Sequence, residues 1–453
     1  MRSLTGFSFT RFDLGTVRAI PTEANSRSTM MKFTTEELLA QQAEVQERYN
    51  QVKKQGLSLD ITRGKPCAEQ LDLSSELLTL PGNTDYKTGA GVDCRNYGGL
   101  DGIPEAKQLF ADYLDVAPRD VIIGGNASLT MMHDALVRAL LFGAPGGDRP
   151  WKDLDSIKFL CPSPGFDRHF AVTEHLGFEL IAIDMKDDGP DMGQVEALVA
   201  EDPAIKGIWC VPKYSNPTGA IYSDAVVDRL AGMQAAAADF RIIWDNAYGE
   251  HPLAGPPDPV KSILRACREA GNPNRVLLFA STSKITHAGS GISAMAAGED
   301  NIADIKKHLS VQTIGPDKVN QLRHMRFFRN YTGLRVHMQR HAQILKPKFD
   351  LVQDILKSEL DGTGRAQWTN PKGGYFVSLN TQDGCARDSI NLSAQAGVKF
   401  TQAGATFPYG VDPRDRNIRI APTFLSLKDI KPAIEALAIS IQLATIQKLL
   451  SAS

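Results

Sequence analysis

Five polar or glycine-rich segments stand directly after short apolar runs of the chain. They occupy residues 124–128, 164–166, 215–219, 245–248 and 281–284. Ligands of parallel α/β sheets bind outside the carboxyl ends of the strands, so we expect the five segments to face one crevice. Their composition suits a large polar ligand that carries a phosphate and an aromatic ring.

Two ionisable residues of this set could do chemistry. Lys284 ends the phrase Ser-Thr-Ser-Lys after the apolar run 276–280. An amine in a partly buried crevice near a second cation has a lowered pKa, which favours nucleophilic attack and proton transfer. Asp245 follows the apolar run 240–244, where a carboxylate is destabilised by desolvation unless it has a partner. The alternatives are a surface lysine in a loop and an aspartate that caps a helix.

A phosphate site is predicted at the start of one helix. Gly125, Asn126 and Ala127 precede a helical stretch that runs to Leu141. Backbone N–H groups at a helix N-terminus bind phosphate. Ser281 and Ser283 are the candidate hydroxyl donors to the same group.

The pattern around these segments predicts an α/β protein. From about residue 80 to 315, helical stretches alternate with short β-rich runs, as in a mostly parallel sheet covered by helices. These runs occupy residues 121–123, 157–161, 180–183, 207–211, 242–244 and 276–280.

Helical and mixed segments flank this region. Thr34 and Glu37 have the spacing of a capping box, which predicts a helix after Thr34. Residues 319–360 have a helical pattern. Strand-like residues 375–379, a helix near 389–396, strand-like residues 416–421 and a long C-terminal helix follow.

A chain of 453 residues is too long for one hydrophobic core. We expect a flexible leader at residues 1–30, a large domain at 76–319 and a discontinuous small domain at 31–75 and 320–453. The leader has the arginines of a transit peptide, but Asp13 and Glu23 weaken that reading.

Composition narrows the class of protein. The formal net charge is −2, so no basic field attracts nucleic acid. Apolar stretches such as residues 433–444 are too short for a membrane span, and none is expected. The six cysteines form no CxxC pair, which favours free thiols in a reducing compartment, and we expect the cytoplasm.

From about residue 57 to 445 the ordered segments resemble the fold-type I enzymes that use pyridoxal 5′-phosphate (PLP). They are most similar to the class I aspartate aminotransferase family. The phrases Asp60-Ile-Thr-Arg-Gly-Lys-Pro66 and Asn96-Tyr-Gly-Gly-Leu-Asp-Gly102 resemble a divergent aspartate-aminotransferase-like branch. The resemblance implies a large domain with a mostly parallel seven-stranded sheet and a smaller, discontinuous α/β domain.

The resemblance also implies roles for single residues. Lys284 would form the Schiff base with PLP, and Asp245 would pair with its pyridine nitrogen. Arg419 would bind the substrate α-carboxylate, because a guanidinium binds a carboxylate through two parallel hydrogen bonds. Further contacts to PLP would come from Tyr97 of a neighbouring subunit in a homodimer and from Gly125, Asn126, Ala127, Phe166, Asn216, Tyr248, Ser281 and Ser283.

The implied reaction is ping-pong transfer of the amino group of L-aspartate to 2-oxoglutarate, giving oxaloacetate and L-glutamate. Gly64 lies in the segment that closes over the amino-acid or 2-oxo-acid substrate. The side-chain carboxylate needs a second cation, for which Arg63, Arg95 and Lys213 are candidates. The chain departs from the family at Ile292, where an arginine usually pairs with the phosphate, so His287 and Ser290 are candidate substitutes.

Other functions remain open at this point. The same fold supports aminotransferases for aromatic or other amino acids, β-lyases and decarboxylases. A Rossmann oxidoreductase is disfavoured, because the glycine-rich phrase at residues 289–294 lies eight residues from the preceding strand and no acidic residue follows at the required distance. A PLP-fold transcription regulator is disfavoured because no basic DNA-binding domain precedes residue 57.

Overall fold

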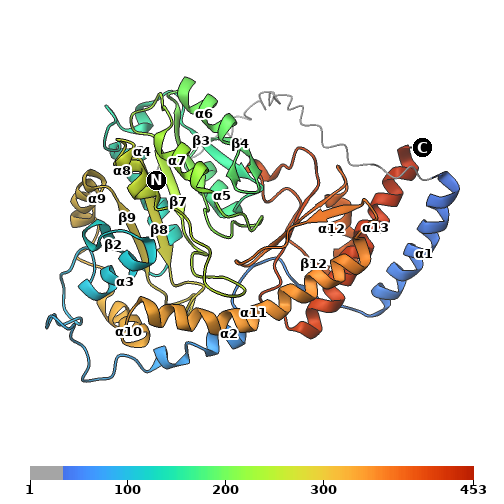
Figure 1. Ribbon diagram of the computed structural model, residues 1–453, viewed down its shortest axis with the longest axis horizontal. Coiled ribbons are helices and arrows are strands. Elements are labelled where there is room, and N and C mark those ends of the chain that lie inside the picture. The colour runs from blue at the N-terminus through green and yellow to red at the C-terminus, as the bar shows by residue number, and fades with distance from the viewer. Residues whose placement is uncertain (1–33, 453) are drawn as a thin grey trace, which may run out of the picture. The chain divides into compact units, whose positions relative to one another are not determined.

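The structure is a computed structural model that describes residues 34–452, so the predicted leader lies outside the described residues. An eight-stranded sheet with the order β2-β9-β8-β7-β6-β3-β4-β5 is its largest sheet (Figure 1). Its strands are β2 (Val121–Ile123), β3 (Lys158–Ser163), β4 (Glu179–Lys186), β5 (Gly189–Pro190), β6 (Ile205–Cys210), β7 (Arg241–Asp245), β8 (Val276–Ser281) and β9 (Ser293–Ala297).

The sheet is mostly parallel, as predicted, with antiparallel pairs at its two ends. The pairs from β4 through β3, β6 and β7 to β8 are parallel. The pairs β2–β9, β8–β9 and β4–β5 are antiparallel. The expected seven strands become eight through the two-residue edge strand β5. No strand was predicted at β9, because its sequence Ser-Ala-Met-Ala-Ala contains mainly residues of low β propensity.

Each face of the large sheet packs into its own hydrophobic core. Successive side chains of a strand point to opposite faces. Thus Ile242 and Trp244 of β7 lie in one core and Ile243 lies in the other. The helices on the first face are α3 (Pro104–Leu114), α6 (Met192–Glu201), α7 (Asp224–Gly232), α8 (Ile263–Glu269) and α10 (Lys318–Phe328). Those on the second face are α4 (Ser128–Phe142), α5 (Asp167–His175) and α9 (Glu299–Gln312).

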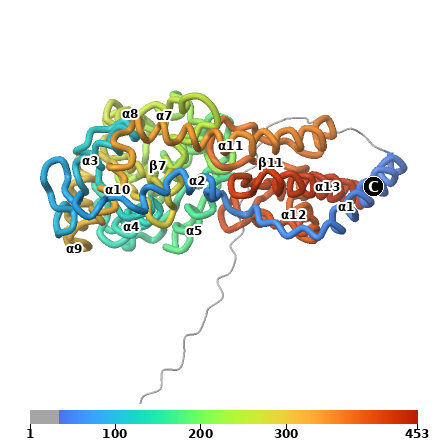
Figure 2. Tube along the Cα trace, turned by 90° about the horizontal axis from the view of Figure 1, so that it is seen from below, coloured from blue at the N-terminus to red at the C-terminus, as the bar shows by residue number. Residues whose placement is uncertain are grey.

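A third core surrounds a smaller antiparallel sheet with the order β10-β11-β13. Its strands are β10 (Ala366–Trp368), β11 (Val377–Thr381) and β13 (Asn417–Ile420), and a separate parallel pair joins β1 (Leu59–Asp60) to β12 (Val398–Lys399). The helices α1 (Thr35–Lys54) and α12 (Ala386–Gln395) pack against α13 (Leu427–Ala452) (Figure 2). The predicted capping box of Thr34 and Glu37 is present at the start of α1.

Helix α11 (Tyr331–Leu360) belongs to two cores. Leu334 and Met338 pack in the first core, whereas its residues from Leu345 onward pack in the third. Tyr248, from the segment after β7, also lies in the third core. The division into domains at residues 76–319 and at 31–75 with 320–453 therefore stays a prediction.

Helix α13 is long and apolar enough to cross a membrane by length and composition. The apolar stretch was expected to be too short, whereas the helix has 26 residues. However, 72% of its apolar window is buried inside the protein. Packing against α1, α11 and α12 accounts for its composition as that of a core helix.

Candidate active site

The five predicted segments follow strands that run in the same direction. β2 is antiparallel to β9, and β9 is antiparallel to β8, so β2 runs parallel to β8, β7, β6 and β3. Their carboxyl ends therefore meet at one edge of the sheet. A hydrogen bond from Ser283 to Asn126 links two of the segments there, and His169, from the helix after the segment 164–166, contacts Asp245.

Lys284 lies three residues beyond β8 and points its amine at an aromatic ring. Its Nζ atom is 4.8 Å from the ring centre of Tyr248. Burial lowers the pKa of the Lys284 amine, and the negative charge of Asp245 opposes that shift. The lowered pKa was expected from partial burial near a second cation; desolvation by burial is its main cause, and no cation among the described residues contributes. Two side chains hold the Lys284 carbonyl oxygen, Tyr375 Oη at 3.3 Å and His251 Nε2 at 3.2 Å.

Asp245 ends β7 with one of its two carboxylate oxygens in use. Oδ2 lies 2.9 Å from Nε2 of His169, and the His169 ring stacks on Trp209 at 4.2 Å. Oδ1 is buried and has no hydrogen-bond partner among residues 34–452. A buried polar atom without a partner is destabilising, so the atom is suited to a donor that the protein chain does not supply.

Asn216 shows the same feature on the neighbouring segment. The residue is 1% exposed, and its Nδ2 atom is buried without a partner in the described part of the chain. Its Oδ1 lies 3.4 Å from Nη1 of Arg419. Phe166 and Asn216 line a small hollow together with His169 and Trp209. An unused donor beside an unused acceptor fits a ring with a protonated nitrogen and a negatively charged oxygen, as in PLP.

The predicted phosphate loop is formed where α4 begins. Ala127 is the N-cap of α4, and a Cβ atom built on Gly125 would meet nothing within 4 Å. Ser283 Oγ donates to the carbonyl of Asn126 at 3.1 Å, and Ser281 Oγ lies 3.1 Å from Ser283 Oγ. The loop thus borders open space at Gly125, while the hydroxyl of Ser281 donates to that of Ser283 and the hydroxyl of Ser283 donates to the loop.

The position of the missing phosphate arginine is buried. Ile292 is 2% exposed, and its N–H donates to Oγ1 of Thr282 at 2.9 Å. His287, a candidate substitute, places Nε2 3.2 Å from the carbonyl oxygen of Leu71. The contact with Leu71 therefore already occupies Nε2 of His287.

Arg419 lies on β13 with its side chain 5% exposed. Its guanidinium lies 5.1 Å from the ring centre of Phe376 and binds Asp167 at 2.8 Å. Gly64 approaches the same ring so closely that a Cβ atom would come within 2.5 Å of it. The fit requires glycine at position 64, and it links the segment predicted to close over substrate with the ring under Arg419.

The three candidate cations for the second carboxylate have different surroundings. Arg95 forms an ion pair with Asp93 at 2.7 Å and lies over the ring of Tyr86. Burial lowers the pKa of Lys213, and the charge of Glu250 opposes this most strongly. Arg63 is exposed and makes no hydrogen bond or ion pair within residues 34–452.

Tyr97 lies away from these groups in the single chain. Its side chain is 83% exposed, on the segment between α2 (Ala68–Asp72) and α3. Lys318 Nζ binds the carbonyl oxygens of Asn96 and Gly98 at 2.5 Å each, which fixes the backbone on both sides of Tyr97.

Sequence reasoning missed two side chains of this site, His169 and Asp167. Both stand on α5, just after Phe166, and His169 is 1% exposed. A signal was present, because residues three apart on a helix share a face and His169 follows Phe166 by three.

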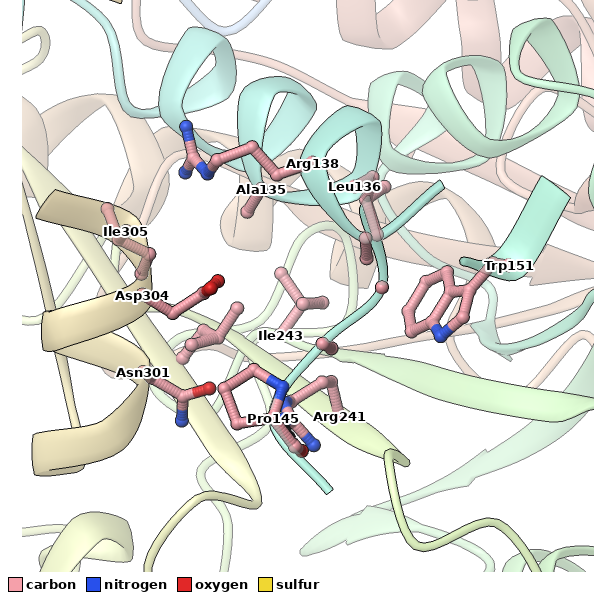
Figure 3. Close-up of a pocket in the computed structure, with 14 residues that line it drawn as sticks. Ala135, Leu136, Arg138, Pro145, Trp151, Arg241, Ile243, Asn301, Asp304 and Ile305 are labelled. Carbon is pink, nitrogen blue, oxygen red and sulfur yellow. Dashed lines mark hydrogen bonds between the residues drawn. The ribbon is translucent and has the colours of Figure 1, made fainter. Parts of the chain in front are cut away.

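A separate cavity lies between α4, α9 and the strands β7 and β8 (Figure 3). Arg138, Arg241 and Asp304 contribute its charged groups. Arg241 donates to the carbonyl oxygens of Phe240 and Pro145, and burial lowers its pKa to about 10. The lining of this cavity shares no residue with the group around Lys284.

Comparison with known proteins relates the site to one family. The family described as aspartate amino-transferase matches residues 33–453. An aspartate aminotransferase of Corynebacterium glutamicum is 43% identical over 419 residues, which cover 92% of this chain and 97% of that protein. A protein of Mycolicibacterium smegmatis is 52% identical over 417 residues, with the same coverage of both chains.

Solved structures agree with these relatives. The crystal structure of an aspartate transaminase from Corynebacterium glutamicum has a TM-score of 0.91 and 43% identity, and the match covers 92% of this chain and 98% of the other. The aspartate aminotransferase of Thermus thermophilus shares the fold at 18% identity with a TM-score of 0.63, over 90% of this chain and 100% of the other. Together these matches show that the chain belongs to the aspartate aminotransferase family.

Proposed function

We propose that the protein uses PLP to transfer the amino group of L-aspartate to 2-oxoglutarate, giving oxaloacetate and L-glutamate. One observation carries this proposal. Asp245 Oδ1 and Asn216 Nδ2 are both buried without partners, in segments that adjoin Lys284 and Arg419. An acceptor, a donor, an amine and a guanidinium are the groups that PLP and an amino acid require together.

PLP, when bound, supplies an aldehyde that captures amines and a ring that withdraws electrons from the substrate Cα atom. Asp245, oriented by His169, holds the proton on the ring nitrogen. Asn216 and Tyr248 donate hydrogen bonds to the ring oxygen, and Phe166 covers the ring. The backbone N–H groups of Gly125, Asn126 and Ala127 bind the phosphate with Ser281 and Ser283.

Lys284 carries the covalent link to the cofactor and then moves the proton. Its lowered pKa keeps a larger share of the amine neutral near pH 7, which both tasks require. The contact of its carbonyl oxygen with Tyr375 and His251 fixes the backbone from which the side chain extends. Once the substrate amine has replaced Lys284 in the link to the cofactor, Lys284 Nζ would accept the proton from the substrate Cα atom and deliver it to the cofactor carbon that carried the aldehyde.

Arg419 binds the α-carboxylate, and Arg63 binds the side-chain carboxylate of aspartate. Arg63 is the candidate that makes no hydrogen bond or ion pair with another described residue, and it adjoins Gly64 on the closing segment. A second cation left unpaired in a closed site costs about 1–3 kcal/mol, so neutral side chains bind less well.

The active species is a homodimer in the cytoplasm. Exposed apolar side chains, which suit a subunit interface, lie on the loop that Lys318 holds, on the segment before it and at the end of α9. They are Leu78, Tyr97, Val311 and Ile314, exposed by 75%, 83%, 89% and 64%. Tyr97 then reaches the phosphate of the neighbouring site. Six free, buried cysteines support a reducing compartment.

The substrate is tested on the protein loaded with PLP. L-aspartate, L-kynurenine and L-alanine are added separately, and the loss of the visible cofactor band is recorded for each. We expect L-aspartate to remove the band at the lowest concentration and 2-oxoglutarate to restore it. A preference for L-kynurenine or L-alanine would contradict the aspartate proposal, and release of ammonia without restoration would indicate a lyase.

A further inference from the structure

Asp167 shares the guanidinium of Arg419, the group proposed above to bind the α-carboxylate. Nη1 of Arg419 lies 2.8 Å from Oδ1 of Asp167 and 3.4 Å from Oδ1 of Asn216. Nη2 lies 3.4 Å from Oγ1 of Thr401, and Nε is buried with no partner in the described part of the chain. A carboxylate thus occupies the Nη1 side, while the side formed by Nε and Nη2 keeps donor capacity.

The fold holds Asp167 where a negative charge is favoured. Asp167 is the first residue of α5, directly after the N-cap Phe166. The N-terminus of a helix favours a negative charge, through its free N–H groups and its dipole. The side chain of Asp167 is 34% exposed, whereas that of Arg419 is 5% exposed. The aspartate can therefore remain hydrated while it neutralises a buried cation.

The ion pair of Asp167 with Arg419 stabilises the substrate-free site and destabilises the substrate-bound site. A buried charge without a partner is strongly destabilising, so Asp167 stabilises Arg419 when no substrate is present. A substrate α-carboxylate on the Nε and Nη2 side would share the guanidinium with a second carboxylate, and like charges repel. Binding must therefore displace Asp167 or tolerate its charge.

We propose that Asp167 is a built-in competitor of the substrate α-carboxylate, which weakens substrate binding and speeds release of the 2-oxo acid product. The proposal rests on the proposed role of Arg419. Asp167 is then a residue that positions and partly neutralises Arg419. It raises KM, since it opposes binding of each carboxylate ligand to the same guanidinium.

The test removes the charge and keeps the shape. Asp167→Asn retains an oxygen that accepts a hydrogen bond from Nη1. The PLP-loaded wild type and the variant are titrated by calorimetry with maleate, an unreactive dicarboxylate. We expect the maleate dissociation constant to fall about five- to tenfold, as for loss of one partly screened neighbouring charge. KM for L-aspartate falls by a similar factor, and kcat changes less.

Three further variants separate this inference from the proposed function. Glu174→Gln removes an exposed charge from the same helix without touching Arg419, and its maleate affinity stays that of the wild type. Asp167→Ala repeats the gain in affinity if competition is the cause. Unchanged or weaker maleate binding in both Asp167 variants overturns the inference. Arg419→Ala should bind maleate at least about tenfold more weakly. An affinity equal to that of the wild type would contradict the proposed role of Arg419 in binding the α-carboxylate.

Discussion

At the scale of residues, the candidate site is defined by side chains whose hydrogen-bonding capacity is only half used. Asp245 presents one bonded and one unpaired oxygen, and Asn216 presents an unpaired amide nitrogen. These features are properties of packing, so the sequence could indicate the residues but not their unused atoms. The positions of Lys284 and Asp245 after strands were predictable, because apolar runs reveal buried strands. The ion pair of Asp167 with Arg419 was not, since it joins residues about 250 positions apart.

Replacing Asp245 by asparagine tests its contact with the ring nitrogen. The amide keeps the size of the side chain but cannot hold a proton on that nitrogen. We expect kcat to fall about a hundredfold or more, near 3 kcal/mol of transition-state stabilisation, with the fold retained by circular dichroism. His169→Gln serves as the comparison and should show a smaller loss, since it acts through Asp245. A kcat of Asp245→Asn equal to that of the wild type would show that Asp245 has only a structural role.

Replacing Lys284 by alanine tests the covalent link. Borohydride reduction of the PLP-loaded wild type should add the cofactor mass to one peptide, the one that contains Lys284. The variant should gain no such mass, because Lys284 supplies the amine that forms the covalent link. Lys307→Ala, at an exposed lysine of α9, is the control and should label as the wild type does. Labelling at another lysine of the wild type would contradict the assignment.

At the scale of elements, a buried polar network joins α2 and α11 to the loop that carries Lys284. Gln70 Nε2 lies 2.9 Å from Tyr375 Oη and 2.9 Å from His341 Nδ1. His341 and His337 are 3.0 Å apart, and His337 Nε2 lies 2.8 Å from the carbonyl oxygen of Ile285. Gln70 is fully buried, so bulk solvent does not reach its side chain.

Gln70→Leu removes the centre of this network. Tyr375 Oη then loses its donor and His341 Nδ1 loses its partner, which should cost about 1–3 kcal/mol of unfolding free energy. The freed Tyr375 also loosens the Lys284 carbonyl, so kcat should fall more than KM changes. Thermal denaturation and steady-state kinetics measure the two effects. Gln46→Leu on α1 removes only a solvent-exposed hydrogen bond to Asn50 and should change neither quantity.

The buried histidines predict loss of stability in mild acid. Burial lowers the pKa of His251 to about 3, of His341 to about 2 and of His324 to about 4. Below the unfolded pKa near 6.5, the unfolded chain binds protons that the folded chain does not. The contribution of these histidines to the free energy of unfolding is therefore fully present above pH 6.5. It falls as the pH drops toward 4, by up to about 1.4 kcal/mol per pH unit for each histidine.

The melting temperature between pH 7.5 and 4.5 measures this dependence. His341→Gln should lower the melting temperature at pH 7.5, because the network is disturbed, but should make its decline toward acid shallower. His175→Gln, at an exposed position, should leave the slope as in the wild type. A slope in His341→Gln as steep as the wild type would show that His341 does not titrate on unfolding.

At the scale of the whole molecule, apolar patterning predicted the mostly parallel sheet and the helices around it. It did not predict the strand β9 or the short strands β1 and β12, because small residues and two-residue pairs carry no periodic signal. The subunit contact proposed for Tyr97 likewise gives no periodic signal in the sequence of one chain, although its exposure of 83% suits an interface.

Mixed subunits test that assembly. If Tyr97 completes a neighbouring site, Lys284→Ala and Tyr97→Ala proteins should each be nearly inactive. Mixing them after mild dissociation should recover activity, because each hybrid dimer contains one intact site. Sedimentation at the assay concentration should show a dimer. Full activity in a monomer, or no recovery in proven hybrids, would contradict a shared site.

The packing of α1 on α13 has a consequence for biosynthesis. The ribosome releases α1 first and α13 last, so the partner of α1 does not exist until translation is nearly complete. At cellular rates, the chain from the end of α10 to the C-terminus takes roughly ten seconds to synthesise. During that time the large sheet is complete, while Val45, Tyr49 and Val52 of α1 have no core to enter. The nascent chain thus exposes the apolar side of α1 while the large sheet is already complete. Truncation before α13 should therefore yield a product that remains bound to chaperones.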